Sequence, residues 1–138
     1  MVVIIKQESG KLEMYEVTII KSFSAAHLLA QIGGKCEELH GHNFKVEVTV
    51  ASPNLNESGL LIDFRIVKKW LSVILDQMDH KHLNELPCFA GINPSAENIA
   101  KYIYTSMGTK ATGSQVRIAR IKVWESENAA VTYIPDGN

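Results

Sequence analysis

The chain has 138 residues, of which 46% are apolar and 21% charged, and its formal net charge is −1. This length and composition predict one folded domain with a substantial core, and the near-neutral charge lacks the basic excess of a nucleic-acid-binding protein. The apolar run Met1–Ile5 is too short for a secretory signal or a membrane span, and two cysteines without a CxxC pair favour a reducing compartment. We therefore expect a cytoplasmic protein that binds neither nucleic acid nor membrane.

The first half of the chain predicts two strands and a helix. Apolar and polar residues alternate over residues 14–26 and 43–51, which predicts strands, and residues 31–38 between them predict a loop. Asp63 is predicted to cap a helix whose apolar residues recur every three or four positions. This stripe, interpreted as core, consists of Phe64, Val67, Leu71, Ile74, Leu75 and Met78.

The second half predicts a helix and two more strands. Asn93-Pro94 is typical of a cap followed by proline at the first helical position, and Gly108 is predicted to end this helix. Strands are predicted over 115–125 and 129–134, joined by a short turn.

The element order strand, strand, helix, helix, strand, strand indicates an α+β domain spanning residues 1–138. We expect a four-stranded antiparallel sheet with both helices packed on one face. Residues 1–13 would form an N-terminal extension in which Met1–Ile5 adds an edge strand. The uncovered face and edges of such a sheet favour self-association.

Three histidines are candidate metal ligands. If residues 40–50 are extended, His40 and His42 project from one face of a strand, and His27 ends the apolar face of the preceding strand. Three neutral imidazoles with a vacant fourth position are the usual arrangement of a catalytic zinc. The alternative that remains open is that these histidines are ordinary core or surface residues.

The two cysteines have different surroundings. Cys36 follows two glycines, and Lys35 together with a nearby zinc would favour its thiolate form. It is a candidate nucleophile or proton carrier, and the alternative is an exposed cysteine without a role. Cys88, between Pro87 and Phe89, is predicted to be a small buried apolar residue.

Two further segments offer acid–base groups. Asp79 and His80 follow the first predicted helix and could move protons as a pair, or His80 could simply be favoured by the helix dipole. Glu125 ends a predicted strand on the face shared by Ile121 and Val123. Its carboxylate would suit a ligand with two adjacent N–H donors, although a solvated carboxylate is the alternative.

Taken together, the motifs resemble the 6-pyruvoyltetrahydropterin synthase and 6-carboxytetrahydropterin synthase family, from about Met14 to Ile134. The matching segments, in order, are Phe23-Ser24-Ala25-Ala26-His27, Cys36-x-x-x-His40-Gly41-His42, Leu61-Ile62-Asp63-Phe64, Asp79-His80-x-x-Leu83-Asn84, Asn93-Pro94-Ser95-Ala96-Glu97-Asn98 and Glu125.

The resemblance implies a tunnelling fold (T-fold), in which three subunits close a barrel and two trimers stack into a hexamer with active sites between subunits. It implies that Cys36 is the catalytic thiol and that Asp79 and His80 form the proton-transfer pair. The implied zinc ligands are His27, His40 and His42, and the implied substrate-binding residues are Glu125, Glu97 and Ser95.

The three residues between Cys36 and His40 resemble the spacing in bacterial and archaeal 6-carboxytetrahydropterin synthases. The implied lyase reaction converts 7,8-dihydroneopterin triphosphate to 6-carboxy-5,6,7,8-tetrahydropterin, acetaldehyde and triphosphate, toward the 7-deazaguanine bases of queuosine-type tRNA. Their positive charge alone makes Lys35 and Lys21 candidate contacts for the triphosphate.

Three alternatives remain open. The first is a pyruvoyl-type enzyme or, because Glu37 follows Cys36, an enzyme that forms 6-hydroxymethyl-dihydropterin. The second is a generic zinc hydrolase with Glu37 or Glu38 as base. The third is a non-catalytic pterin- or nucleotide-binding module with structural zinc.

Overall fold

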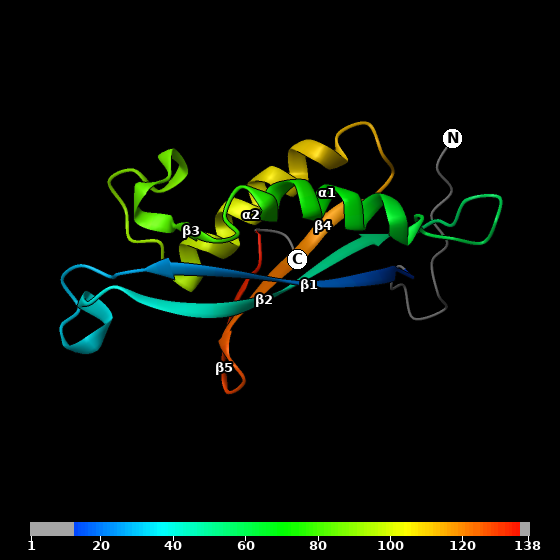
Figure 1. Ribbon diagram of the computed structural model, residues 1–138. Coiled ribbons are helices and arrows are strands. Elements are labelled where there is room, and N and C mark those ends of the chain that lie inside the picture. The colour runs from blue at the N-terminus through cyan, green and yellow to red at the C-terminus, as the bar shows by residue number, and fades with distance from the viewer. Residues whose placement is uncertain (1–12, 136–138) are drawn as a thin grey trace.

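The computed structural model describes residues 13–135, which form one sheet covered by two helices (Figure 1). The strands lie in the order β3-β1-β2-β4-β5. The predicted edge strand Met1–Ile5 lies outside the described residues.

The centre of the sheet is a long antiparallel pair. β1 (Tyr15–His27) and β2 (His40–Ser52) are in register from Tyr15 opposite Ser52 to His27 opposite His40. β2 therefore begins three residues before the predicted start. This extension makes His27 and His40 direct cross-strand neighbours.

The other two predicted strands are present at the far side of β2. β4 (Arg117–Ser126) pairs antiparallel with β2, and β5 (Ala129–Tyr133) pairs antiparallel with β4. A register irregularity between Trp124 and Ser126 precedes the turn into β5. Glu125 thus lies at the irregular end of β4, the place where bulges commonly redirect a side chain.

Both helices, α1 (Phe64–Asp76) and α2 (Ala96–Ala111), cover the same face of the sheet, as predicted (Figure 1). Asp63 caps α1 by accepting the N–H of Arg65. Most of the predicted apolar stripe is buried, but Phe64 at the first helical position is 56% exposed, so its assignment to the core was wrong. The fully buried core residues include Phe44, Leu71, Ile74, Leu75, Met78, Ile99, Ile103, Met107 and Ile121.

Both predicted ends of α2 were wrong. The cap is Ser95 rather than Asn93, because the Ser95 side chain accepts the N–H of Asn98. The helix also continues through Gly108 to Ala111. A glycine inside a helix costs about 1 kcal/mol relative to alanine, and burial of Met107 and Ala111 on either side outweighs that cost.

The predicted strand count was also wrong, because the sheet has a fifth, short strand. β3 (Lys81–His82) pairs in parallel with Ala25 and Ala26 of β1, so the sheet is not purely antiparallel. The backbone N–H of His80 donates to the carbonyl of Ser24 at 2.6 Å and docks this segment on the edge of β1. Two residues are too few to show the alternation by which strands are predicted.

Three short 3₁₀ turns complete the structure: η1 (Gly34–Glu37), η2 (Leu83–Glu85) and η3 (Pro87–Phe89). The predicted loop between β1 and β2 contains the first of them. Among residues 13–135 no helix is both long enough and apolar enough to cross a membrane.

Candidate active site

The three predicted ligand histidines lie together where β1 ends and β2 begins. His27 and His40 are cross-strand partners, and His42 projects from the same face two residues later. The ligand nitrogen atoms of the three side chains all lie within 4.8 Å of one another. Strand alternation and register alone therefore create a group that can hold one metal ion.

Backbone carbonyls orient two of these rings. Nδ1 of His27 lies 2.7 Å from the carbonyl oxygen of Pro94, and Nδ1 of His40 lies 2.7 Å from that of Glu38. Since a carbonyl oxygen only accepts, each Nδ1 carries the proton and each Nε2 keeps its lone pair for a metal. Sequence reasoning missed Pro94 in this role because a backbone carbonyl leaves no side-chain signal.

The chemistry of His27 fits a metal ligand. Its side chain is fully buried, and its Nε2 has no hydrogen-bond partner among the described residues. Burial lowers the pKa of His27 below its ordinary value, which favours the neutral imidazole that metals require. An unpaired buried nitrogen is costly, and a zinc ion on three imidazoles would satisfy it.

The histidine cluster opens onto a cavity of about 360 Å³ that also contains Cys36 and Glu125. The remaining residues that line it are Leu29, Lys35, Glu38, Leu39, His40 and His42. Oε1 of Glu125 lies 3.7 Å from Nε2 of His27. A thiol, a carboxylate and a candidate metal site thus face one space large enough for a small molecule.

The predicted pair of Asp79 and His80 is formed, but in a different place. Nδ1 of His80 lies 3.0 Å from Oδ2 of Asp79, while Oδ1 of Asp79 accepts the backbone N–H of Ser24 at 2.9 Å. That N–H donor holds the pKa of the Asp79 carboxyl below its ordinary value. The His80 side chain is 82% exposed.

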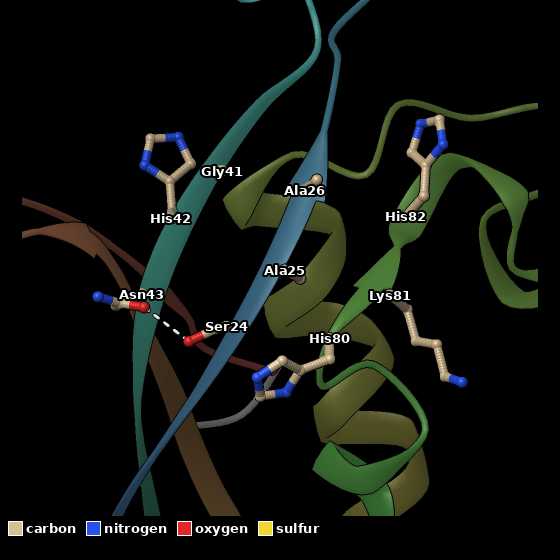
Figure 2. Close-up of a pocket in the computed structure, with 9 residues that line it drawn as sticks. All are labelled: Ser24, Ala25, Ala26, Gly41, His42, Asn43, His80, Lys81 and His82. Atoms are coloured by element: carbon tan, nitrogen blue, oxygen red, sulfur yellow. Dashed lines mark hydrogen bonds between the residues drawn. The ribbon is translucent and has the colours of Figure 1, made fainter.

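His80 lines a second cavity, of about 510 Å³, with Ser24, Asn43, Lys81 and His82 among its neighbours (Figure 2). Figure 2 shows His80 and His42 on opposite sides of β1. The two cavities share only His42 among their lining residues. Within one chain, the structure therefore does not bring Cys36 and the Asp79–His80 pair into one cavity.

The other predicted substrate contacts are not in the Cys36 cavity either. The Ser95 side chain is occupied in capping α2, and Glu97 is exposed in the first turn of that helix. Of the two lysines, Lys35 lines the Cys36 cavity, whereas Nζ of Lys21 donates to Ser72 on α1.

The remaining candidates have local roles. Oε1 of Glu37 accepts the backbone N–H of Gln31 at 2.9 Å, so this carboxylate is engaged within its own loop. Cys88 is only partly buried, packs against the core as predicted, and burial raises the pKa of its thiol. Nδ1 of His82 lies 3.4 Å from the carboxylate of Glu85.

An α+β domain in which a three-histidine group adjoins a cavity lined by two of these histidines, a thiol and a carboxylate has the make-up of a metal-dependent enzyme that acts on a small molecule. The sequence model of the family described as 6-pyruvoyl tetrahydropterin synthase matches residues 16–136. The chain belongs to this family, as the sequence motifs predicted.

Relatives of the chain carry at least three different names, one of which is the dihydroneopterin monophosphate aldolase of Pyrococcus furiosus, 34% identical over 80% of this chain and 89% of that protein. The 6-carboxy-5,6,7,8-tetrahydropterin synthase of Haemophilus influenzae is 32% identical over 87% of this chain and 99% of that protein. The 6-pyruvoyl tetrahydrobiopterin synthase of Homo sapiens is 33% identical over 81% of this chain and 86% of that protein.

The structure of 6-pyruvoyl tetrahydropterin synthase from Caenorhabditis elegans has a TM-score of 0.80 at 25% identity, covering 90% of this chain and 97% of that one. This likeness confirms the predicted T-fold, with the strand count corrected above.

Proposed function

We propose that the protein is a zinc-dependent 6-carboxy-5,6,7,8-tetrahydropterin synthase of the cytoplasm that acts in 7-deazaguanine biosynthesis. It converts 7,8-dihydroneopterin triphosphate and one molecule of water into 6-carboxy-5,6,7,8-tetrahydropterin, acetaldehyde and triphosphate. The observation that carries this proposal is the cavity lined by Cys36, Glu125 and two histidines of the three-histidine group, His40 and His42.

Each group in the cavity has a chemical task. The Glu125 carboxylate accepts two N–H bonds from the amino-pyrimidine edge of the pterin, the geometry in which carboxylates bind guanidinium groups. Zinc on His27, His40 and His42 supplies Lewis-acid polarisation of the substrate side chain when it is bound. Cys36 takes or returns a proton at that side chain, and Lys35 at the rim attracts the triphosphate.

The second proton-transfer group comes from a neighbouring subunit. Cys36 and the Asp79–His80 pair line different cavities, so the two would meet only if another copy brings its own pair to the first cavity. The same assembly would cover the face of the sheet that no helix covers within residues 13–135 (Figure 1). We infer a homohexamer of two stacked trimers, in which Ser95 and Glu97 contact a pterin held across the subunit boundary.

The choice among pterin reactions rests on the loop of Cys36. The three residues between Cys36 and His40 resemble the spacing in bacterial and archaeal 6-carboxytetrahydropterin synthases, and this resemblance favours the carboxypterin product over the pyruvoyl product. Glu37 does not line the cavity that contains Cys36, and its Oε1 accepts the Gln31 N–H, which together speak against Glu37 as the base of a hydroxymethyl-forming enzyme or of a zinc hydrolase.

The product identifies the reaction. The zinc-loaded protein is incubated with 7,8-dihydroneopterin triphosphate, and the products are identified by mass spectrometry. We expect acetaldehyde and 6-carboxytetrahydropterin in equal amounts. A hydroxymethyl pterin with a two-carbon hydroxyaldehyde would identify the folate-type alternative, and a pyruvoyl pterin would identify the biopterin-type alternative. Unchanged substrate would contradict all three pterin reactions.

The Asp79→Asn variant tests the proton-transfer pair. The new amide oxygen can still accept the Ser24 N–H, so the fold is preserved, but the charge beside His80 is lost. We expect kcat to fall on the order of 100-fold with little change in zinc content. The matched control is Asp76→Asn, at the exposed last position of α1, which should leave kcat unchanged. An active Asp79→Asn enzyme would remove the pair from the mechanism.

A further inference from the structure

The four residues that follow His27 are held along one edge by two asparagine side chains. Asn84 accepts the N–H of Leu28 and donates to the Leu28 carbonyl, both at 3.0 Å. Asn93 makes the same pair of bonds to Ala30, at 2.8 and 3.0 Å. Each side-chain amide thus satisfies both backbone groups of one residue.

These side-chain bonds continue the pairing at the edge of β1 beyond the point where β1 and β3 end. Ala26 pairs with His82 of β3, and two residues later Leu28 is bonded by Asn84, so the parallel register is extended by a side chain. In a strand, alternate residues present their N–H and C=O groups to the same edge. Asn84 and Asn93 therefore bind Leu28 and Ala30 as a neighbouring strand would.

The opposite edge of the same segment holds the loop of the catalytic thiol. The N–H of Leu29 donates to the carbonyl of Cys36 itself at 2.7 Å, and the N–H of Gln31 donates to Glu37. The segment 28–31 therefore connects the asparagine pair on one side to Cys36 on the other, and it follows directly on the candidate metal ligand His27.

The loop that contains Cys36 needs this support because few of its own side chains are buried against the rest of the protein. All residues from Ala30 to Leu39 are exposed, and no residue of η1 is buried. Segments with few buried contacts open at low free-energy cost. Without a fixed partner for Leu29, Cys36 would take many positions relative to the histidines, and small misplacements of a reacting group are costly to catalysis.

We propose that Asn84 and Asn93 are positioning residues that fix Cys36 relative to His27 through the segment 28–31. Neither side chain lines the cavity that holds Cys36. The expected fall in turnover when these asparagines are replaced rests on the proposed function, whereas the expected loosening of the segment 28–31 does not.

The test compares Asn84→Ala and Asn93→Ala with the wild type in the full chain, by amide hydrogen exchange resolved at Leu29. Neither asparagine bonds the Leu29 N–H, which donates to the Cys36 carbonyl. Exchange of the Leu29 amide therefore reports on the edge of the segment that faces Cys36. Loss of two backbone bonds is expected to speed Leu29 exchange about 10-fold or more. We expect kcat to fall by about the same factor with a smaller change in KM, because positioning of the thiol is lost and the Glu125 contact is kept.

The matched control is Asn56→Ala. Asn56 also accepts two backbone N–H groups, those of Ser58 and Leu60, but in the loop between β2 and α1 at the far end of the sheet (Figure 1). Leu29 exchange and kcat should be unchanged in this variant. Equal acceleration of Leu29 exchange in Asn56→Ala would show a general loosening and overturn the proposal.

Wild-type Leu29 exchange in both asparagine variants would also overturn it. If the alanine variants do not fold, the isosteric Asn93→Asp decides: it keeps an acceptor for the Ala30 N–H but sets an oxygen against the Ala30 carbonyl. Faster Leu29 exchange in Asn93→Asp supports the proposal, and a wild-type rate overturns it. If the wild type does not convert the pterin, the proposed function fails while the exchange result still decides the positioning role.

Discussion

Replacing His40 with alanine is expected to lower zinc affinity at least 100-fold and to abolish turnover. His40 is one of three imidazoles whose nitrogens lie within 4.8 Å, and no other described side chain joins that group. Loss of a group that hydrogen-bonds a metal ligand already lowers metal affinity or activity about 10- to 100-fold, so loss of a ligand itself should lower it further. Zinc affinity is measured by competition with a chromogenic chelator, and turnover by release of triphosphate.

The matched control for zinc binding is His82→Ala. His82 is also a histidine with a partly buried ring, but its Nδ1 lies beside Glu85 and it is not in the three-histidine group. We expect its zinc affinity to equal that of the wild type. Full zinc affinity in His40→Ala, or equal losses in the two variants, would contradict the assignment of the metal site.

The histidine group could be predicted from the sequence because it depends on one local rule. Side chains alternate along a strand, so His40 and His42 must share a face once residues 40–52 form β2. His27 ends the preceding strand, and the cross-strand pairing of adjacent strands then brings it opposite His40. The alternation of side chains along each strand and the pairing of two strands adjacent in sequence were sufficient to predict the histidine group.

The parts that sequence reasoning missed depend on contacts between distant segments. Asparagine before proline predicts a helix cap at Asn93, yet the Asn93 side-chain amide binds Ala30, 63 residues away. The strand β3 exists because Ser24 binds Asp79 and His80 at the edge of β1. No local sequence pattern around Asn93 or around Asp79 and His80 indicates these distant contacts. The separation of the two cavities could therefore not be predicted from the sequence either.

That separation leads to a prediction about mixed assemblies. Cys36→Ala and His80→Ala, each alone, are expected to lose activity on the order of 100-fold or more. If each site takes its thiol from one subunit and its His80 from another, co-assembly of equal amounts gives sites with both groups intact. With random mixing, roughly a quarter of the sites are complete, so activity should return to roughly a quarter of the wild-type value.

The control mixture is Cys36→Ala with His40→Ala. Cys36 and His40 line the same cavity of one chain, so every site in this mixture lacks one of the two groups and activity should stay low. Recovery in the first mixture but not in the second requires that His80 reach Cys36 from another copy. If neither mixture recovers although mass spectrometry shows mixed assemblies, the Asp79–His80 pair acts within its own chain, and the loop of Cys36 must then move toward β3 during turnover.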